Sequence, residues 1–198
     1  MPENVRVTYV VTESLNWNIV LFPGVVFHEL SHFLVCLLMG SRVTGGRFWG
    51  EKEAAIVHEE VPGIRGYLIS AAPFLLGTGA TVAFLYLAKL AARGLSFSSP
   101  WQSIFQVLAL YYLALSIAVH CFPSSRDAAN AMNNLSSFYA RKASMADGAI
   151  QGIFWLATVP FIFLPLYLGA IVMAIFSTVR NMGFLWFVVL FWLVAAWL

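Results

Sequence analysis

Residues 17–39 read WNIVLFPGVVFHELSHFLVCLLM, and this stretch decides the fold because it combines a long apolar run with ionisable side chains. A helix needs about 20 mostly apolar residues to cross a bilayer, and this stretch is long enough. It nevertheless carries His28, Glu29 and His32 near its centre. An ionisable group at mid-bilayer costs roughly 2.5–3.5 kcal/mol. The stretch therefore predicts a membrane-spanning helix that holds a functional site.

The composition of the whole chain also favours a membrane protein. Of its 198 residues, 61% are hydrophobic and 10% are charged, whereas a soluble domain carries about 25% charged residues. The net charge of +2 is too small to predict a nucleic-acid partner. Cys36 and Cys121 are too few for a disulfide framework. Residues 1–16 lack a basic region followed by an apolar core, so we expect no cleavable signal peptide.

Five stretches are apolar and long enough, or nearly so, to cross the bilayer as helices. They cover residues 17–39, 67 to about 90, about 101 to 122, about 150 to 176, and 182–198. We therefore expect an all-α multi-pass membrane protein with about five transmembrane helices. It would form a single domain, residues 1–198, with a core of three spans at 17–135 and two accessory spans at 148–198.

The segments between these spans have their own signals. Residues 41–61 mix glycines with alternating polar and apolar residues and lead into Pro62-Gly63, which predicts a small β-hairpin between the first and second spans. The N-terminal VRVTYVVT is strand-like and is a candidate third strand. Residues 123–147 are polar, but contain enough alanine, methionine and leucine for a helix.

The distribution of basic residues predicts the orientation. With five spans, the loops at 40–66 and 123–149 lie on the side of the C-terminus, and this side holds Arg42, Arg47, Lys52, Arg65, Arg126, Arg141 and Lys142. The other side holds Arg6, Lys89, Arg93 and Arg180. The richer side is predicted to be cytoplasmic. At about 1.5 Å per residue, the two histidines then lie roughly 10–17 Å from the cytoplasmic end of their helix.

The HELSH sequence at residues 28–32 indicates a metal site. On a helix, His28 and His32 lie on one face and can direct their nitrogen atoms at one ion. Glu29 lies about 100° around the helix, where it can reach a water bound to that ion. This is the arrangement of zinc hydrolases, with two imidazole ligands and a carboxylate that acts as the general base. The alternative is a polar cluster packed between helices or lining a proton path.

A catalytic zinc ion usually has three protein ligands and one open position. Asp127, in HCFPSSRDAAN after the third span, is the preferred third ligand, and His120 is the second candidate. Ser124 or Ser125 can also cap a helix that has Asp127 in its first turn. The Asp127 carboxylate can take part in the cap and also bind a metal ion, because it has two oxygens. For Asp127 to reach the deeper histidines, Pro123 must break the helix and turn the chain inward.

The order of these motifs resembles the site-2 protease family of intramembrane zinc proteases. HELSH is followed by the hairpin, by AAPFLLG at 71–77 in the second span, and by HCFPSSRD at 120–127. The resemblance covers about residues 17–135. It implies one zinc ion per chain on His28, His32 and Asp127, with Glu29 as the catalytic base. His120 and Pro123 match family positions that bind substrate, although the family usually has asparagine where His120 stands.

The resemblance further implies that the chain cleaves peptide bonds in or near transmembrane segments of other membrane proteins. The partners expected are such a substrate and the lipid bilayer, in the cell membrane of a prokaryote, with the active site nearer the cytoplasmic side. The hairpin would hold an unwound substrate segment by β-addition. Two other functions stay open. One is a transporter or proton relay that uses the histidines and Glu29, and the other is a pseudoprotease that binds partners without cleaving them.

Overall fold

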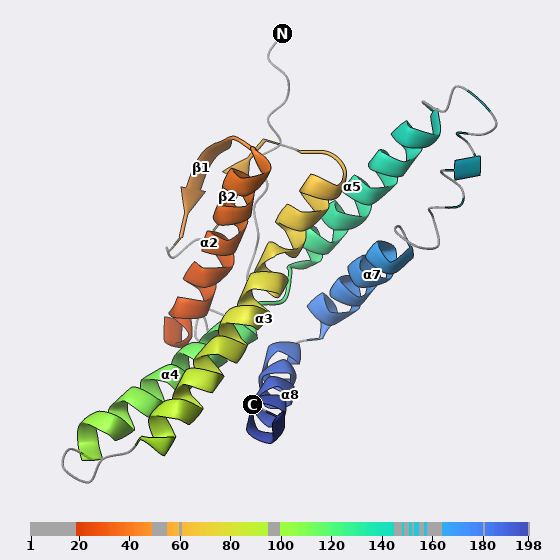
Figure 1. Cartoon of the computed structure of the whole chain (residues 1–198). Helices are drawn as coiled ribbons and strands as arrows, with labels where there is room; N and C mark the ends of the chain where they lie inside the picture. Colours follow the sequence, from red (N-terminus) through yellow and green to blue (C-terminus); the bar gives the residue numbers. More distant parts are fainter. Residues whose placement is uncertain are drawn as a thin grey trace.

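The computed structural model describes residues 19–48, 55–59, 61–94, 100–144, 164–179 and 181–197, together with residues 148, 151, 153, 154 and 157. These residues form long helices and one hairpin (Figure 1). In chain order, the elements are α2 (Phe22–Met39), β1 (Val43–Arg47), β2 (Ala55–His58), α3 (Ile64–Arg93), α4 (Pro100–His120), α5 (Ser125–Ser144), α7 (Leu164–Thr178) and α8 (Met182–Trp197).

Three of the five predicted spans are confirmed as long apolar helices. In the described part of the chain, residues 22–39, 64–93 and 101–120 are long and apolar enough to cross a membrane. The last two predictions differ from the structure. Helices α7 and α8 are each short and meet at an angle of 115°, so within the described residues they provide at most one further span together. The predicted fourth span begins at about residue 150, and part of it lies outside the described residues.

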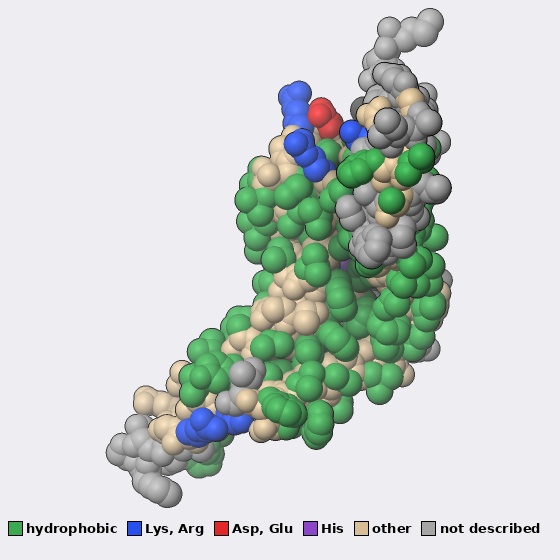
Figure 2. Space-filling model, turned by 45° about the vertical axis from the view of Figure 1, so that its right-hand side comes forward, with side chains coloured by type: hydrophobic (Ala, Val, Ile, Leu, Met, Phe, Trp, Pro, Cys, Tyr) green, Lys and Arg blue, Asp and Glu red, His purple; other side chains and the backbone are tan. Residues whose placement is uncertain are grey.

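The surface is compatible with an integral membrane protein. Large hydrophobic side chains are exposed on several helices, for example Trp101 at 81% and Trp192 at 63%. Figure 2 shows Lys and Arg side chains at the two ends of the molecule and hydrophobic side chains over the region between them. Lipid can cover such a band without the loss of free energy that water would impose.

Helix α3 is the longest element and the centre of the packing. Helices α2, α4, α5 and α8 all contact it. Helices α4 and α5 lie along different parts of its length, and the chain breaks between them at residues 121–124 (Figure 1). A Cβ atom on Gly77 of α3 would lie 2.5 Å from the Cβ of Cys121, so the missing side chain lets α3 approach this break closely.

The start of α2 packs tightly against the end of α4. The Ser116 hydroxyl accepts a hydrogen bond from the Gly24 N–H at 2.7 Å and donates one to the Leu21 carbonyl at 2.8 Å. Ser116 therefore does for α2 what an N-cap residue normally does. A Cβ on Gly24 would lie 1.9 Å from the Ser116 carbonyl oxygen, so this contact needs glycine. The packing sets the second turn of α2 level with His120.

The break before α5 differs from the expected inward turn. Helix α4 ends at His120 and α5 begins at Ser125, as a helix-breaking Pro123 predicts. However, α5 continues along α3 rather than folding back (Figure 1). No inward turn is needed, because the contact between α2 and α4 already places His28 beside the end of α4.

The predicted hairpin is confirmed. Strands β1 and β2 pair antiparallel, and a bulge interrupts β1 between Val43 and Gly45. Two hydrogen bonds close its base, from the Ser41 hydroxyl to the Glu59 carbonyl and from the Glu59 N–H to the Arg42 carbonyl. The candidate third strand, VRVTYVVT, lies outside the described residues.

An aromatic cluster joins the last two helices to the rest of the molecule. The ring of Phe122, in the break between α4 and α5, lies 5.5 Å from Phe176 of α7 and 6.2 Å from Trp186 of α8. The Trp186 ring also stacks on Phe74 of α3, and its indole N–H donates to the Thr78 hydroxyl at 3.2 Å. Helices α7 and α8 therefore both contact the break that leads into α5, through the Phe122 ring.

Candidate metal centre

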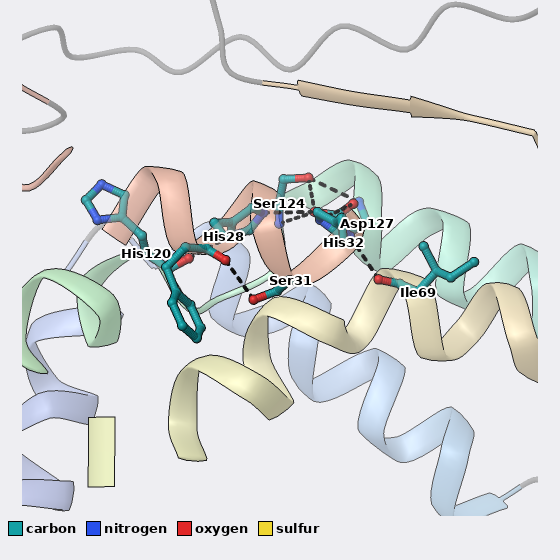
Figure 3. A network of polar contacts seen from close by, with 8 residues as sticks. His28, Ser31, His32, Ile69, His120, Ser124 and Asp127 are labelled. Atoms are coloured by element: carbon teal, nitrogen blue, oxygen red, sulfur yellow. Dashed lines mark hydrogen bonds and ion pairs between the residues drawn. The ribbon is translucent and has the colours of Figure 1, made fainter. Parts of the chain in front are cut away.

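Helix α2 places two imidazoles one above the other. His28 and His32 are separated by one turn, and their ring centroids lie 5.0 Å apart. His32 is 8% exposed, and Glu29, between them in sequence, is 7% exposed. Both rings face the start of α5 (Figure 3). The apolar face around them leaves these buried polar groups to be satisfied by neighbouring elements.

The first turn of α5 presents the carboxylate. Ser124 precedes the helix, and its hydroxyl accepts a hydrogen bond from the Asp127 N–H at 3.1 Å. In return, Asp127 Oδ2 accepts bonds from the Ser124 hydroxyl at 2.7 Å and from the Ser124 N–H at 2.9 Å. This is a capping box with aspartate in the third helical position. It fixes the carboxylate and turns it toward α2.

The three side chains converge on one point. Asp127 Oδ2 lies 3.8 Å from Nε2 of His28, and Oδ1 lies 3.6 Å from Nε2 of His32. One ligand atom from each residue lies within 4.8 Å of the others, so the group could hold a metal ion. Three ligand atoms bound tetrahedrally at about 2.1 Å from zinc lie about 3.4 Å apart, slightly less than the two distances from the histidine Nε2 atoms to the nearer carboxylate oxygen.

Backbone carbonyls fix the orientation of both rings. Nδ1 of His28 lies 2.7 Å from the His120 carbonyl oxygen, and Nδ1 of His32 lies 2.9 Å from the Ile69 carbonyl oxygen. A carbonyl only accepts, so each Nδ1 must carry the proton and donate it. In the neutral rings, each Nε2 then has a lone pair directed at the carboxylate. Histidine ligands of metals are commonly held in this way.

The charge of Asp127 completes the fit to a cation. Burial alone would raise the pKa of Asp127, but the charge of His32 and hydrogen bonding to both imidazoles lower that pKa well below its usual value. Asp127 is therefore a carboxylate. Without an ion, protons on the imidazoles balance the carboxylate; neutral imidazoles with Nδ1 protonated instead present their Nε2 lone pairs to a cation. The three groups could hold a metal ion at the point where they meet.

The metal-binding group opens into a polar cavity of about 600 Å³. Strand β2, the start of α3, α5 and the HELSH face of α2 form its walls. Glu29 lines the cavity beside the histidines, and the backbone of Ile56 in β2 is within hydrogen-bonding reach of its carboxylate. Glu29 is outside the metal-binding group, so its carboxylate is available to a water molecule or a substrate in the cavity.

The two candidates for the third ligand have different positions in the structure. Asp127 groups with the histidines, whereas the His120 ring turns away from them (Figure 3) and its Nδ1 contacts the Ser116 carbonyl at 3.0 Å. His120 contributes its carbonyl oxygen to the site instead. Pro123 is buried, and neither His120 nor Pro123 is among the described residues that line the cavity.

Several contributors to the site were not predicted from the sequence. The carbonyls of Ile69 and His120 are backbone groups, which carry no sequence signal. The α5 residues that line the cavity did leave a signal, since Asp127, Asn130, Asn134, Ser137 and Arg141 recur at intervals of three and four. Such spacing marks one face of a helix.

Comparisons of the chain with protein-family models, curated proteins and solved structures find no significant match.

Proposed function

We propose that this chain is an intramembrane zinc metalloprotease. The observation that carries the proposal is the convergence of the His28 and His32 Nε2 atoms and the Asp127 carboxylate, next to Glu29, at one end of a polar cavity beside the apolar helices α2 and α3. Two histidines, one carboxylate and a nearby glutamate match the ligand and base set of zinc peptidases. The sequence resemblance to site-2 proteases agrees with this reading.

The chemistry divides between the ion and Glu29. When bound, zinc acts as a Lewis acid, which lowers the pKa of water to about 7 and polarises the substrate carbonyl. Glu29 then takes the proton from the attacking water and gives it to the leaving amine. His28, His32 and Asp127 hold the ion, and the Ile69 and His120 carbonyls keep the two rings in the required tautomer.

The substrate in this proposal is an unwound segment of another membrane protein. Strand β2 offers an edge to such a segment. The Glu59 N–H bonds to Arg42, next to β1, and backbone N–H groups alternate in direction along a strand. The N–H of Val57 therefore faces β1, and that of Ile56 faces away from it, toward Glu29 and the cavity. An extended peptide can add there as a third strand beside the catalytic base.

A proton relay or transporter is the second candidate, since ionisable residues within membrane helices often serve transport. A relay needs imidazoles that exchange protons at both nitrogens. Here both Nδ1 atoms are bound to carbonyls at 2.7 and 2.9 Å, which favours fixed ligands. A relay also has no need for a bound divalent ion.

The test is to purify the full chain in detergent as wild type, Glu29→Gln and Asp127→Ala, and to measure bound zinc and cleavage of a model transmembrane peptide. We expect about one zinc per chain and cleavage in the wild type. Glu29→Gln should keep zinc and lose at least about a hundredfold in rate, because the general base is removed. Asp127→Ala should lose both. Wild-type protein that binds no zinc, or cleavage that survives in Glu29→Gln, would refute the proposal.

A further inference from the structure

Helix α5 has a polar face that the proposed chemistry does not use. Asp127 lies at one end of this face and Arg141 at the other, with Asn130, Asn134 and Ser137 between them. All five line the cavity. The opposite face of α5 is apolar and packs against α3 and α7 through Ala128, Ala131 and Leu135. We call the five residues of the polar face the α5 stripe.

The α5 stripe and β2 both line the cavity, and together they suit an extended polypeptide. Asparagine side chains both donate and accept hydrogen bonds, as does the backbone of an unwound peptide. A helical segment satisfies these groups internally, whereas an extended one must find partners. The edge of β2 supplies such partners to the cavity, and so do Asn130 and Asn134.

The charges of the cavity are arranged by position. Among the described lining residues, the acidic Glu29 and Asp127 and the basic Arg126 all lie at the metal-binding end. Arg141 lies at the far end of the α5 stripe, and its side chain is exposed to the cavity. A zinc ion bound there would balance the charges of Asp127 and Glu29, which leaves Arg126 and Arg141 as the remaining fixed charges among the described lining residues. A positive wall favours a substrate segment that carries an acidic residue.

The helix geometry sets the position of that residue. Arg141 follows Asp127 by 14 positions, which corresponds to about 21 Å along a helix. An extended chain covers this length in about six residues. We infer that the α5 stripe is a substrate-binding site that selects an extended polypeptide with an acidic side chain about six residues from the scissile bond, next to Arg141. This inference rests on the proposed protease function.

The test measures binding separately from cleavage. The probes are fluorescein-labelled peptides that each have a Leu/Ala-rich half and a polar half. In one series the polar half carries a single Asp at one of its positions two to ten. The reference peptide has Asn at all of these positions. Binding to the full-length, zinc-loaded Glu29→Gln protein is followed by fluorescence anisotropy, and wild-type cleavage maps the scissile bond in each peptide. We expect the tightest binding when Asp lies about six residues from that bond, by about twofold to fivefold over the Asn peptide.

Arg141→Gln should remove this preference and leave the binding of the Asn peptide unchanged. Lys142→Gln is the matched control, because it makes the same charge change one residue away, where the ammonium lies 5.9 Å above the Phe138 ring. The inference is overturned if Asp and Asn peptides bind equally, if the position of Asp has no effect, or if both variants weaken binding alike. A further outcome is that the wild type cuts none of the peptides while binding still prefers Asp at one fixed position and still loses this preference in Arg141→Gln. That result would support the binding site and refute the protease function.

Discussion

Ser124 and Asp127 hold each other across the first turn of α5, with the Ser124 hydroxyl 2.7 Å from Asp127 Oδ2 and 3.1 Å from the Asp127 N–H. The same carboxylate faces both histidines, with Oδ1 3.6 Å from Nε2 of His32. Asp127 thus takes part in the cap of α5 and also completes the metal-binding group. The orientation of this carboxylate therefore depends on a serine that is not itself in the metal-binding group.

Replacement of Ser124 by alanine should weaken zinc binding. The change removes the hydroxyl that orients Asp127, and loss of such a partner typically lowers metal affinity about tenfold to a hundredfold. It should also lower the free energy of unfolding by about 1 kcal/mol, because the helix cap is lost. Zinc affinity can be measured by competition with a chromophoric chelator. Ser125→Ala is the control, because Ser125 is exposed in the same turn. Equal affinities for the two variants would contradict this role of Ser124.

Gly24→Ala should destabilise the protein by about 1–3 kcal/mol. A Cβ at this position would lie 1.9 Å from the Ser116 carbonyl oxygen, so α2 and α4 must separate. Gly79→Ala provides the comparison, since a Cβ on Gly79 in the middle of α3 meets nothing within 4 Å. That variant should be neutral or more stable by up to about 1 kcal/mol. Thermal unfolding in detergent measures both, and a Gly24→Ala protein as stable as Gly79→Ala would show that the contact between α2 and α4 is unimportant.

Zinc should raise the melting temperature of the metal-free wild type. An ion that binds only the folded state stabilises it by about 2.7 kcal/mol at a free concentration one hundred times Kd. His32→Ala should show little or no such increase, because it removes one of the three ligands. Calcium prefers sites with six to eight oxygen ligands and serves as the ion control. An increase that persists in His32→Ala would place the zinc elsewhere.

Ile56→Pro should impair peptide cleavage more than Ile56→Ala does. Proline removes the backbone N–H that faces Glu29 and the cavity, whereas alanine removes only the side chain. Since this N–H points away from β1, the hairpin should survive the change. The expected effect is a rise in KM for a transmembrane peptide, measured beside zinc content to confirm an intact site. Identical kinetics in the two variants would exclude addition of the substrate to this edge.

The sequence was sufficient to predict the parts of the site that depend on local spacing. The interval between His28 and His32 defines one helix face, and the short supply of acids and histidines points to Asp127. The closure of the site was not predictable, because the partners of the two Nδ1 atoms are backbone carbonyls on α3 and α4. Any residue type can supply a carbonyl, so only the fold reveals which one is near.

The last two helices show the limit of hydropathy as a predictor. Residues 164–178 and 182–197 are apolar enough to be placed in lipid, and they were predicted as parts of two separate spans. Composition does not report direction, and the structure places a bend of 115° between them. A Cβ on Gly183 would lie 2.5 Å from the Cα of Val119, so α8 begins in close contact with the end of α4.

The metal-binding group also has a consequence for the cohesion of the fold. His32 and Asp127 lie about 95 residues apart in the chain, on helices that share few apolar contacts near the site. An ion bound to both closes a loop of that length, and in the unfolded chain such a closure costs about 4 kcal/mol of conformational entropy. A bound ion would therefore brace the molecule much as a cross-link does, and a cell short of zinc would hold a chain that opens more easily to degradation.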